Sequence, residues 1–239
     1  RIVVFPDPGY PAYHRGTLFA GGISHPVALT GDYIFRPWEL DEDILKKTRL
    51  LWLNSPHNPS GVVMSLEELH RVAELCRKYD ILCVSDETYA DIYDSTPPAS
   101  ILQTGLQNVL AIHSLSKRSN VPGFRSGFAV GDKNIITSFK KLRHYCAGQQ
   151  PIPIQEAATA LWNDDDHAEK NRKKYKGDPD NVIYRSGWER YAFQWCDSQT
   201  QITEWSSEEV VIPYFYDVDK KYHRYFMDLK MIMEDGSTW

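Results

Sequence analysis

The sequence lacks the features that mark membrane, secreted and nucleic-acid-binding proteins. No apolar run approaches the ~18 residues that a membrane-spanning helix needs, and no charged segment precedes an apolar one as in a signal peptide. The four cysteines are far apart, without C-x-x-C or metal-type histidine spacing, which favours reduced thiols. The 32 acidic side chains outnumber the 27 basic ones, which is atypical of a nucleic-acid binder. We expect a soluble cytoplasmic protein that binds neither membrane nor nucleic acid.

The distribution of charge divides the chain into two unequal parts. Residues 1–175 carry 20 basic and 20 acidic side chains, whereas residues 176–239 carry 7 and 12. The second part also holds 13 of the 30 aromatic residues. A length of 239 residues would suit one large or two ordinary domains, and a change in both charge and aromatic density at one place predicts a domain boundary near residue 175. No internal repeat or low-complexity tract interrupts either part.

The first part alternates between strand and helix patterns. Ser65-Leu-Glu-Glu68 is a capping box that opens an apolar-periodic run, and helices are also predicted over 132–145 and 154–175. Short apolar, β-branched runs predict strands over 2–5, 50–54, 81–85, 109–113 and 127–130. Because the strands are almost continuously apolar, this alternation predicts an α/β fold with a parallel sheet that has helices on both faces.

Polar side chains follow three of these strands, where the ligands of such sheets bind. Asn58 follows the strand over 50–54, and Asp86 with Tyr89 follows the one over 81–85. The strand over 109–113 leads into Ser114-Leu-Ser-Lys117, and Arg125 comes eight residues after that lysine. Each has a simpler interpretation: Asn58 as part of a turn, Asp86 as a helix cap, Lys117 as a solvated charge and Arg125 as an ion-pair partner. Because all these positions fall at successive strand ends, we expect them to converge in one crevice.

An amine, a carboxylate, a phenol, a hydroxyl and a guanidinium together suit pyridoxal phosphate. The amine forms a Schiff base with the aldehyde of this cofactor, the carboxylate faces the pyridinium nitrogen, and the guanidinium binds the phosphate. The stretches that carry these groups resemble the class I/II aminotransferases of fold type I over residues 1–175. They are Asp7-Pro-Gly-Tyr-Pro11, Ser55-Pro-His-Asn-Pro-Ser-Gly61, Val84-Ser-Asp-Glu-Thr-Tyr89 and His113-Ser-Leu-Ser-Lys-Arg-Ser-Asn-Val-Pro-Gly-Phe-Arg-Ser-Gly127.

The resemblance implies a role for each matching residue. Lys117 is similar to the Schiff-base lysine, which also moves a proton at the substrate Cα, and Asp86 to the partner of the pyridine nitrogen. The remaining matches imply cofactor contacts: Asn58 and Tyr89 at the phenolic oxygen, Ser114 and Arg125 at the phosphate, and Tyr10 as an aromatic beside the cofactor or substrate.

The same resemblance suggests a substrate class and an assembly. The run around the lysine is most similar to succinyldiaminopimelate aminotransferases of lysine biosynthesis, so amino-acid and 2-oxo-acid substrates and a homodimer are expected. The family normally has about a hundred further residues before Arg1 and a small domain with the arginine that binds the substrate α-carboxylate. Because residues 1–175 match the family's large domain alone, we expect cofactor chemistry with poor or absent transamination.

Residues 176–239 resemble a different protein, the T4-type phage head completion nuclease of the PD-(D/E)xK kind. The resemblance implies a small α+β restriction-endonuclease-like fragment in which Glu189 and Asp228 are the carboxylates for Mg²⁺. On spacing alone, each could equally be a surface carboxylate. The chain stops at Trp239, where the family's Glu-x-Lys strand begins, so we expect this fragment not to cleave DNA.

Three interpretations of the whole chain follow. In the first, a truncated aminotransferase is joined to a truncated nuclease near Tyr175. An assembly or cloning artefact, or an incomplete reading frame, explains this join more simply than an evolved bifunctional enzyme. In the second, the chain is a DNA-processing or virion protein whose aminotransferase part is inert. In the third, it is a non-catalytic scaffold that uses only the α/β fold.

Overall fold

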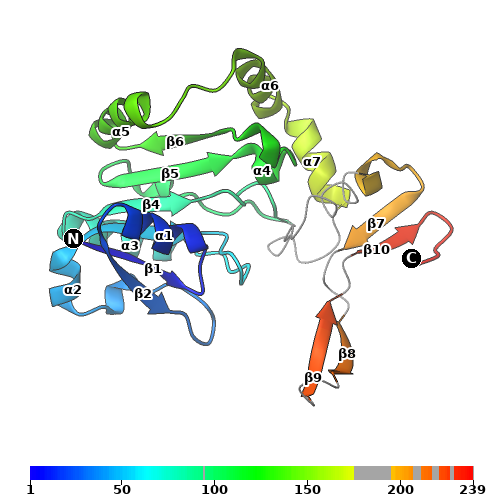
Figure 1. Ribbon diagram of the computed structural model, residues 1–239, viewed down its shortest axis with the longest axis horizontal. Helices are drawn as coiled ribbons and strands as arrows, with labels where there is room; N and C mark the ends of the chain where they lie inside the picture. Colours follow the sequence, from blue (N-terminus) through cyan, green and yellow to red (C-terminus); the bar gives the residue numbers. More distant parts are fainter. Residues whose placement is uncertain (94, 175–194, 207–210, 217–220, 227–228, 239) are drawn as a thin grey trace.

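A six-stranded sheet organises the first part of the chain in the computed structural model (Figure 1), which describes residues 1–93, 95–174, 195–206, 211–216, 221–226 and 229–238. The strand order is β2-β1-β3-β4-β5-β6. Strands β1 to β5 run parallel, and β6 runs antiparallel to β5. Their bounds are β1 Ile2–Asp7, β2 Ile23–Ala28, β3 Thr48–Asn54, β4 Leu82–Asp86, β5 Val109–Ser114 and β6 Gly127–Gly131. The predicted α/β fold with a mostly parallel sheet is confirmed.

All five predicted strands are present, but the sequence did not predict β2. This strand forms one edge of the sheet, and Pro26 lies within it. Proline cannot donate a hydrogen bond to a neighbouring strand, so it argues against a central strand and is tolerated at an edge. The pattern of β2 was therefore too weak to be recognised without its partner β1.

Seven α-helices accompany the sheet in this part of the structure: α1 Pro11–Phe19, α2 Glu42–Lys47, α3 Leu66–Lys78, α4 Leu115–Arg118, α5 Lys133–Cys146, α6 Ile152–Trp162 and α7 Asp165–Lys174. Short 3₁₀ turns lie at Pro37–Glu39, Ile101–Thr104 and Pro122–Phe124. The single helix predicted over 154–175 is wrong. Asn163 ends α6, and the carboxylate of Asp164 accepts a 2.8 Å hydrogen bond from the His167 amide in α7. A side chain that caps a new helix favours a break in the old one.

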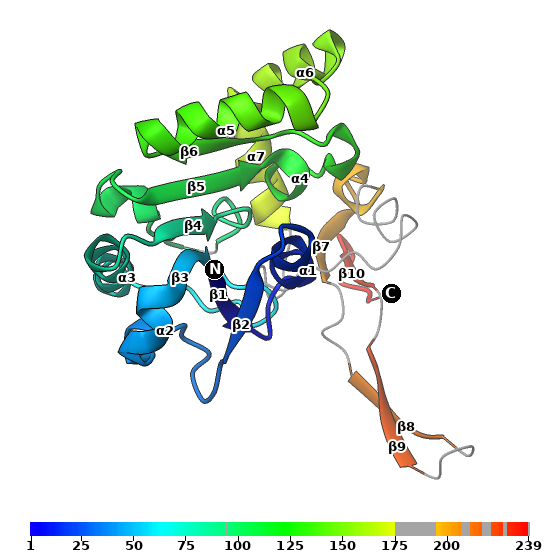
Figure 2. The same ribbon diagram turned by 60° about the vertical axis from the view of Figure 1, so that its left-hand side comes forward.

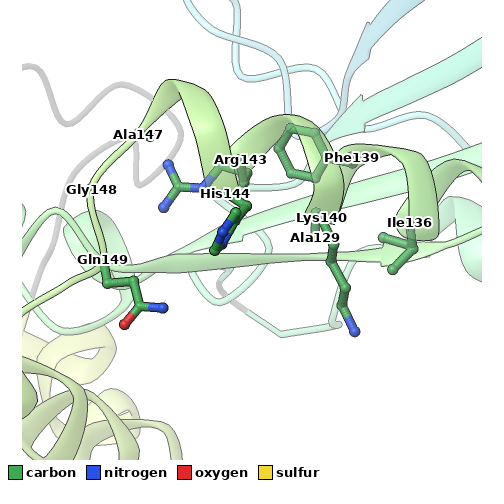
Figure 3. A pocket seen from close by; sticks show the side chains of 9 residues that line it. All are labelled: Ala129, Ile136, Phe139, Lys140, Arg143, His144, Ala147, Gly148 and Gln149. Carbon is green, nitrogen blue, oxygen red and sulfur yellow. The ribbon is translucent and has the colours of Figure 1, made fainter.

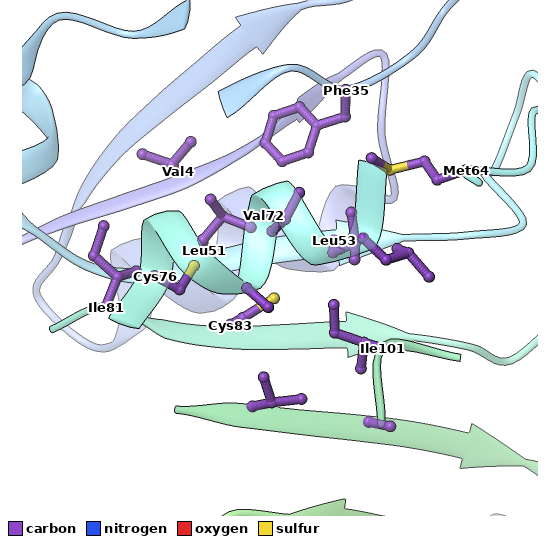
Figure 4. Close-up of a cluster of buried hydrophobic side chains, with 14 of the residues drawn as sticks. Val4, Phe35, Leu51, Leu53, Met64, Val72, Cys76, Ile81, Cys83 and Ile101 are labelled. Atoms are coloured by element: carbon purple, nitrogen blue, oxygen red, sulfur yellow. The ribbon is translucent and has the colours of Figure 1, made fainter. Parts of the chain in front are cut away.

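Helix α3 is stabilised both by its N-terminal capping box and by packing of its apolar face in the core. The predicted capping box is present: the Ser65 hydroxyl accepts from the Glu68 amide at 3.3 Å, and the Glu68 carboxylate accepts from the Ser65 amide at 2.7 Å. The apolar face of α3, which includes Val72, packs against Leu51 and Leu53 of β3 in a fully buried core (Figure 4). This contact fixes α3 on one face of the sheet.

The opposite face of the sheet is covered by α1. Tyr13 of α1 stacks on Trp52 at 4.8 Å between ring centroids. Because side chains alternate along a strand, Trp52 points away from the face that carries Leu51 and Leu53. Helix α5 lies along β6 at the far edge of the sheet (Figure 2) and has no buried residue. The prediction of helices on both faces is confirmed.

The described segments after residue 194 form two antiparallel strand pairs. Strand β7 Ile202–Ser206 pairs with β10 Lys230–Met233, and β8 Val211–Tyr216 pairs with β9 Lys221–Phe226. Cys196, Ile202 and Trp205 form a small buried cluster. A turn follows β10, in which the Gly236 amide donates to the Met233 carbonyl at 2.9 Å. The predicted boundary near residue 175 lies at the edge of a segment outside the described residues.

Two further features bear on the sequence predictions. The four cysteines are all free thiols. Among the residues that the structure describes, no helix combines the length and the apolar character that a membrane crossing requires.

Candidate active site

The seven side chains assigned to the cofactor site from the sequence line one cavity of about 450 Å³. Strands β3, β4 and β5 end at Asn54, Asp86 and Ser114. Because these strands are parallel neighbours, their carboxyl ends meet at one edge of the sheet, where open α/β sheets bind ligands. The cavity brings together Tyr10, Asn58, Asp86, Tyr89, Ser114, Lys117 and Arg125. The convergence predicted from the strand ends is therefore present in the structure.

Asp86 is fixed by hydrogen bonds on both of its carboxylate oxygens. Its Oδ2 accepts from the Tyr13 hydroxyl at 2.8 Å, and its Oδ1 accepts from the Thr88 amide at 3.2 Å and the Thr88 hydroxyl at 2.6 Å. A carboxylate has about four acceptor positions, so these three bonds leave room for one more donor. The carboxylate is thus held in place with capacity for a cationic N–H in the cavity.

Asn58 and Tyr89 form a second polar pair. The Asn58 amide donates a hydrogen bond to the Tyr89 hydroxyl at 3.2 Å. Burial, followed by the negative charge of Asp86, raises the pKa of Tyr89 to about 12. The phenol therefore keeps its proton at neutral pH and is available as a donor.

Lys117 projects from α4 above this pair. Its Nζ lies 5.5 Å from the centroid of the Tyr89 ring. Burial lowers the pKa of Lys117 from 10.5 to about 8, because a charged ammonium is poorly solvated there. A substantial fraction of the amine is then neutral near physiological pH, which is the form that can act as a nucleophile or a base.

Ser114, Ser116 and Arg125 surround the lysine with donors. The Ser114 hydroxyl donates to the Ser116 hydroxyl at 2.9 Å and accepts from the Ser116 amide at 3.1 Å. Arg125 has a left-handed backbone, with φ of 50°, and its carbonyl accepts a 3.0 Å bond from Gln150. A left-handed conformation at a non-glycine residue is often found at functional sites. Two hydroxyls and a guanidinium that line the same cavity suit an anion such as phosphate.

Tyr10 lies at the rim of the cavity and is 51% exposed. Its ring meets the edge of the Tyr13 ring with 5.8 Å between centroids. Its predicted contact with the cofactor or the substrate stays a prediction.

The sequence did not single out Asn54 and Tyr13, although both line the cavity. The buried side-chain amide of Asn54 donates to the backbone carbonyls of Pro56 at 2.8 Å and Asp86 at 2.9 Å. Its Oδ1 accepts from the backbone N–H of Asn58 at 2.7 Å. Asn54 therefore orients two of the predicted residues. The strand-end rule could have found it, since it is the last residue of β3. Tyr13 had no comparable signal.

A second, larger cavity of about 590 Å³ lies between α5 and the segment that follows it (Figure 3). Its basic side chains are Lys140 and Arg143, His144 also lines it, and no carboxylate is among the described residues that line it. It lacks the acid and the phenols of the first cavity, so the chemistry predicted from the sequence belongs to the smaller one.

The two carboxylates predicted to bind Mg²⁺, Glu189 and Asp228, lie outside the described residues. Among the residues that are described, no cluster of three or more His, Cys, Asp or Glu side chains could hold a metal ion. The nuclease-like site stays a prediction.

Comparison with known protein families identifies the family of this chain. The family model for aminotransferases of class I and II matches residues 1–206. The chain belongs to this family. The match extends 31 residues beyond the boundary predicted near residue 175. It therefore includes part of the segment over 176–239 that resembles a nuclease.

Aminotransferases with closely related sequences occur in several bacteria. The chain is 36% identical to an LL-diaminopimelate aminotransferase of Aquifex aeolicus, over 73% of this chain and 47% of that protein. It is 37% identical to an LL-diaminopimelate aminotransferase of a Nostoc species, over 68% of this chain and 43% of that protein. The chain thus spans about half the length of the curated relatives that it matches.

Solved aminotransferase structures share the fold. An aminotransferase from Neisseria meningitidis superposes with a TM-score of 0.69 at 36% identity, covering 72% of this chain and 46% of that one. The aminotransferase AspB of Helicobacter pylori gives 0.67 at 38% identity, covering 77% and 53%. The sheet that carries the cavity is therefore the mostly parallel sheet of a fold-type I aminotransferase.

Proposed function

We propose that the chain binds pyridoxal phosphate and, with the low transamination activity expected from its sequence, uses it to transfer an amino group from an amino acid to a 2-oxo acid. The observation that carries this proposal is the cavity in which the Lys117 amine, the Asp86 carboxylate and the Arg125 guanidinium meet. Membership of the aminotransferase family supports it. Bound pyridoxal phosphate supplies an aldehyde that reacts with amines and a ring that accepts electrons.

The donor set of the cavity fits this cofactor. Asp86 would accept from the ring nitrogen with the capacity that Tyr13 and Thr88 leave, and Asn58 with Tyr89 would donate to the phenolic oxygen. The phosphate would be held by the hydroxyls of Ser114 and Ser116 and the guanidinium of Arg125, and Tyr10 would contact the ring or the substrate at the cavity mouth.

Lys117 would carry the chemical step. With a pKa of about 8, its Nζ is partly neutral near pH 7.5 and can attack an aldehyde without strong base. The same Nζ, once free of the cofactor, would take the proton from the Cα of the bound amino acid. Because Tyr89 stays protonated up to about pH 12, it does not compete for this proton as a base.

The proposed amino donor is an amino acid of the diaminopimelate class, with a free or a succinylated distal amine. This is supported by the two relatives of Aquifex and Nostoc, which are named LL-diaminopimelate aminotransferases. It is also supported by the sequence run from His113 to Gly127. A homodimer is proposed for the assembly, as the family resemblance implies.

The first experiment tests cofactor binding. Purified protein mixed with pyridoxal phosphate should give a visible absorbance band, and borohydride should fix the pyridoxyl group on the peptide that contains Lys117. Lys117→Ala should lose both signals, whereas Lys133→Ala, at an exposed lysine, should keep them. Absence of the band in folded wild-type protein contradicts the proposal.

The second experiment tests the substrate. Adding LL-diaminopimelate or its N-succinyl derivative to the cofactor complex should bleach the band, and a 2-oxo acid should restore it. Aspartate at the same concentration serves as the comparison donor. Equal bleaching by aspartate and by both diaminopimelates would remove the proposed substrate class but keep the transamination.

The division of the chain near residue 175 is a further part of the proposal, supported by the change in charge and aromatic content there. Residues 176–239 are proposed to be a nuclease-like fragment that does not cleave DNA. Plasmid incubated with the protein and Mg²⁺ should therefore stay supercoiled. Nicking that is lost in Asp228→Ala would show an active nuclease instead.

A further inference from the structure

Arg118, the residue after the candidate catalytic lysine, is a cation removed from water. Its side chain is only 4% exposed, although arginine side chains are rarely buried without partners. It is the last residue of α4, which has only four residues. A single helical turn is unstable by itself, so α4 depends on its neighbours for its position.

The guanidinium of Arg118 is bound on all three nitrogens. Nη1 donates to the carbonyl of Leu161 at 2.6 Å, Nη2 contacts Asp165 Oδ1 at 2.5 Å, and Nε lies 3.4 Å from Asp91 Oδ2. The guanidinium carbon also lies 5.4 Å from the centroid of the Trp162 ring. Arg118 therefore contacts three separate parts of the chain.

Each of these contacts has a physical reason. Leu161 lies in the last turn of α6, where the carbonyls lack partners within the helix and the helix dipole attracts a cation. Asp165 begins α7, and its negative charge offsets that of the guanidinium. Asp91 lies two residues after Tyr89 in the loop that borders the cavity. The planar guanidinium of arginine carries its five N–H donors on three separate nitrogens and so reaches these separated acceptors, whereas lysine presents its three donors from a single nitrogen.

The other end of α4 has its own attachment. The Leu115 amide donates to the Ser126 carbonyl at 3.1 Å, and Leu115 is fully buried. Lys117 lies between this attachment and Arg118. The direction of the Lys117 side chain is therefore set by two fixed points, of which Arg118 is the one at the C-terminal end.

We propose that Arg118 is a positioning residue that holds the Lys117 amine in the cavity by fastening α4 to the end of α6 and to Asp91. This inference rests on the proposed function, because it assigns the purpose of the anchor to the reactive lysine. Without the fork of Arg118, α4 should loosen, and the Lys117 amine should move toward water.

The test measures the Lys117 amine directly, without cofactor. The protein is labelled with trace acetic anhydride from pH 6 to pH 10.5, and the peptide that contains Lys117 is quantified by mass spectrometry. The wild-type midpoint should lie near pH 8, and in Arg118→Gln it should rise toward 10.5, the ordinary value for lysine. A rise of about one pH unit lowers the neutral fraction at pH 8 roughly five-fold.

Two further variants make the result specific. Arg118→Lys retains the charge and the aliphatic stem but not the fork, so its midpoint should also rise; it replaces Arg118→Gln if that variant does not fold. Arg77→Gln is the matched control, because Arg77 donates to the Thr104 carbonyl at 2.5 Å and fastens α3 away from the cavity. It should lower stability and leave the midpoint of Lys117 near pH 8.

An unchanged midpoint in a folded Arg118 variant, or an equal rise in Arg77→Gln, would overturn the inference. Cofactor binding is measured separately on the same samples. A wild-type protein that gives no band with pyridoxal phosphate, while Arg118→Gln still shifts the midpoint, would remove the proposed function and leave the anchoring role in place.

Discussion

The hydroxyl of Tyr13 donates a 2.8 Å hydrogen bond to Oδ2 of Asp86, although 73 positions separate the two residues. Tyr13 is 2% exposed and is held flat against Trp52. Burial, followed by the nearby charge of Asp86, raises the pKa of Tyr13 far above its usual value, so the phenol stays a donor. Helix α1 thus orients a carboxylate at the end of β4.

The first prediction removes this hydroxyl. Tyr13→Phe keeps the stacking on Trp52 but deprives the Asp86 carboxylate of a donor. A hydrogen bond to a charged partner contributes about 1.5–3 kcal/mol, so the free energy of unfolding should fall by about 2 kcal/mol. Urea denaturation at pH 7 measures the change. Tyr79→Phe is the control: its hydroxyl makes an exposed 3.4 Å contact with Glu42, and its loss should cost less than about 0.5 kcal/mol. Equal losses in the two variants would assign no special role to the Asp86 contact.

The second prediction concerns Asn54, which is 4% exposed and donates to two backbone carbonyls. Asn54→Asp retains the shape but points a carboxylate oxygen at the carbonyls of Pro56 and Asp86. The loss of two buried donors should lower the free energy of unfolding by about 3 kcal/mol and weaken cofactor binding. Thermal unfolding and titration with pyridoxal phosphate measure the two effects.

The matched control for Asn54 is Asn134→Asp, the same chemical change in the exposed first turn of α5. An acidic side chain is favourable at that end of a helix, so no loss of stability is expected. A comparable loss in both variants would mean that the amide of Asn54 does not organise the strand ends.

Much of the candidate site was predictable because the rule that locates it is general. Parallel strands end at one edge of the sheet, so the polar residues after each apolar run had to converge. Asn58, Asp86 and Lys117 were found in this way, from strands whose bounds were nearly right. The convergence of these residues followed from the order of the strands and their common direction, without knowledge of side-chain geometry.

The contacts of Tyr13 and Arg118 were not predictable by the same rule. Helix α1 buries only Tyr13 and Thr17, so it has little amphipathic pattern to recognise. The partner of Arg118 in α7 depends on the break after Trp162, which the apolar pattern over 154–175 did not reveal. Such contacts form because loops bring segments together that are far apart in the sequence. No local sequence pattern shows which distant segments will meet.

The third prediction tests a feature that the sequence did contain. Ser65→Ala removes the hydroxyl that accepts from the Glu68 amide at the start of α3. Loss of an N-cap costs typically about 1 kcal/mol, which urea denaturation should detect. Ser138→Ala, at an exposed position within α5, should instead be neutral or slightly stabilising, because alanine favours a helix interior. Equal effects would indicate that the capping box does not stabilise α3.

The fourth prediction follows from the lowered pKa of Lys117, which falls from 10.5 to about 8 on folding. Below pH 8 the amine is charged in both the folded and the unfolded chain, and its burial as an ammonium destabilises the fold. Between pH 8 and pH 10.5 this lysine binds a proton in the unfolded chain but not in the folded chain. The free energy of unfolding therefore rises with pH over this range. Lys117→Met removes the buried charge, and at pH 7 it should raise the free energy of unfolding by up to about 3 kcal/mol.

The pH dependence of this gain separates a buried charge from better packing. The difference between Lys117→Met and wild type should shrink as the pH rises from 8 to 10.5, because the wild-type amine then loses its charge in the fold. A gain from packing of the methionine would stay constant over the same range. Lys46→Met supplies the baseline, since the Lys46 side chain is 58% exposed in a surface pair with Glu42 and should give a difference within about 0.5 kcal/mol at both pH values. A constant gain for Lys117→Met from pH 7 to pH 10 would contradict a buried charge on this amine, and with it the argument that the cavity holds a reactive neutral lysine.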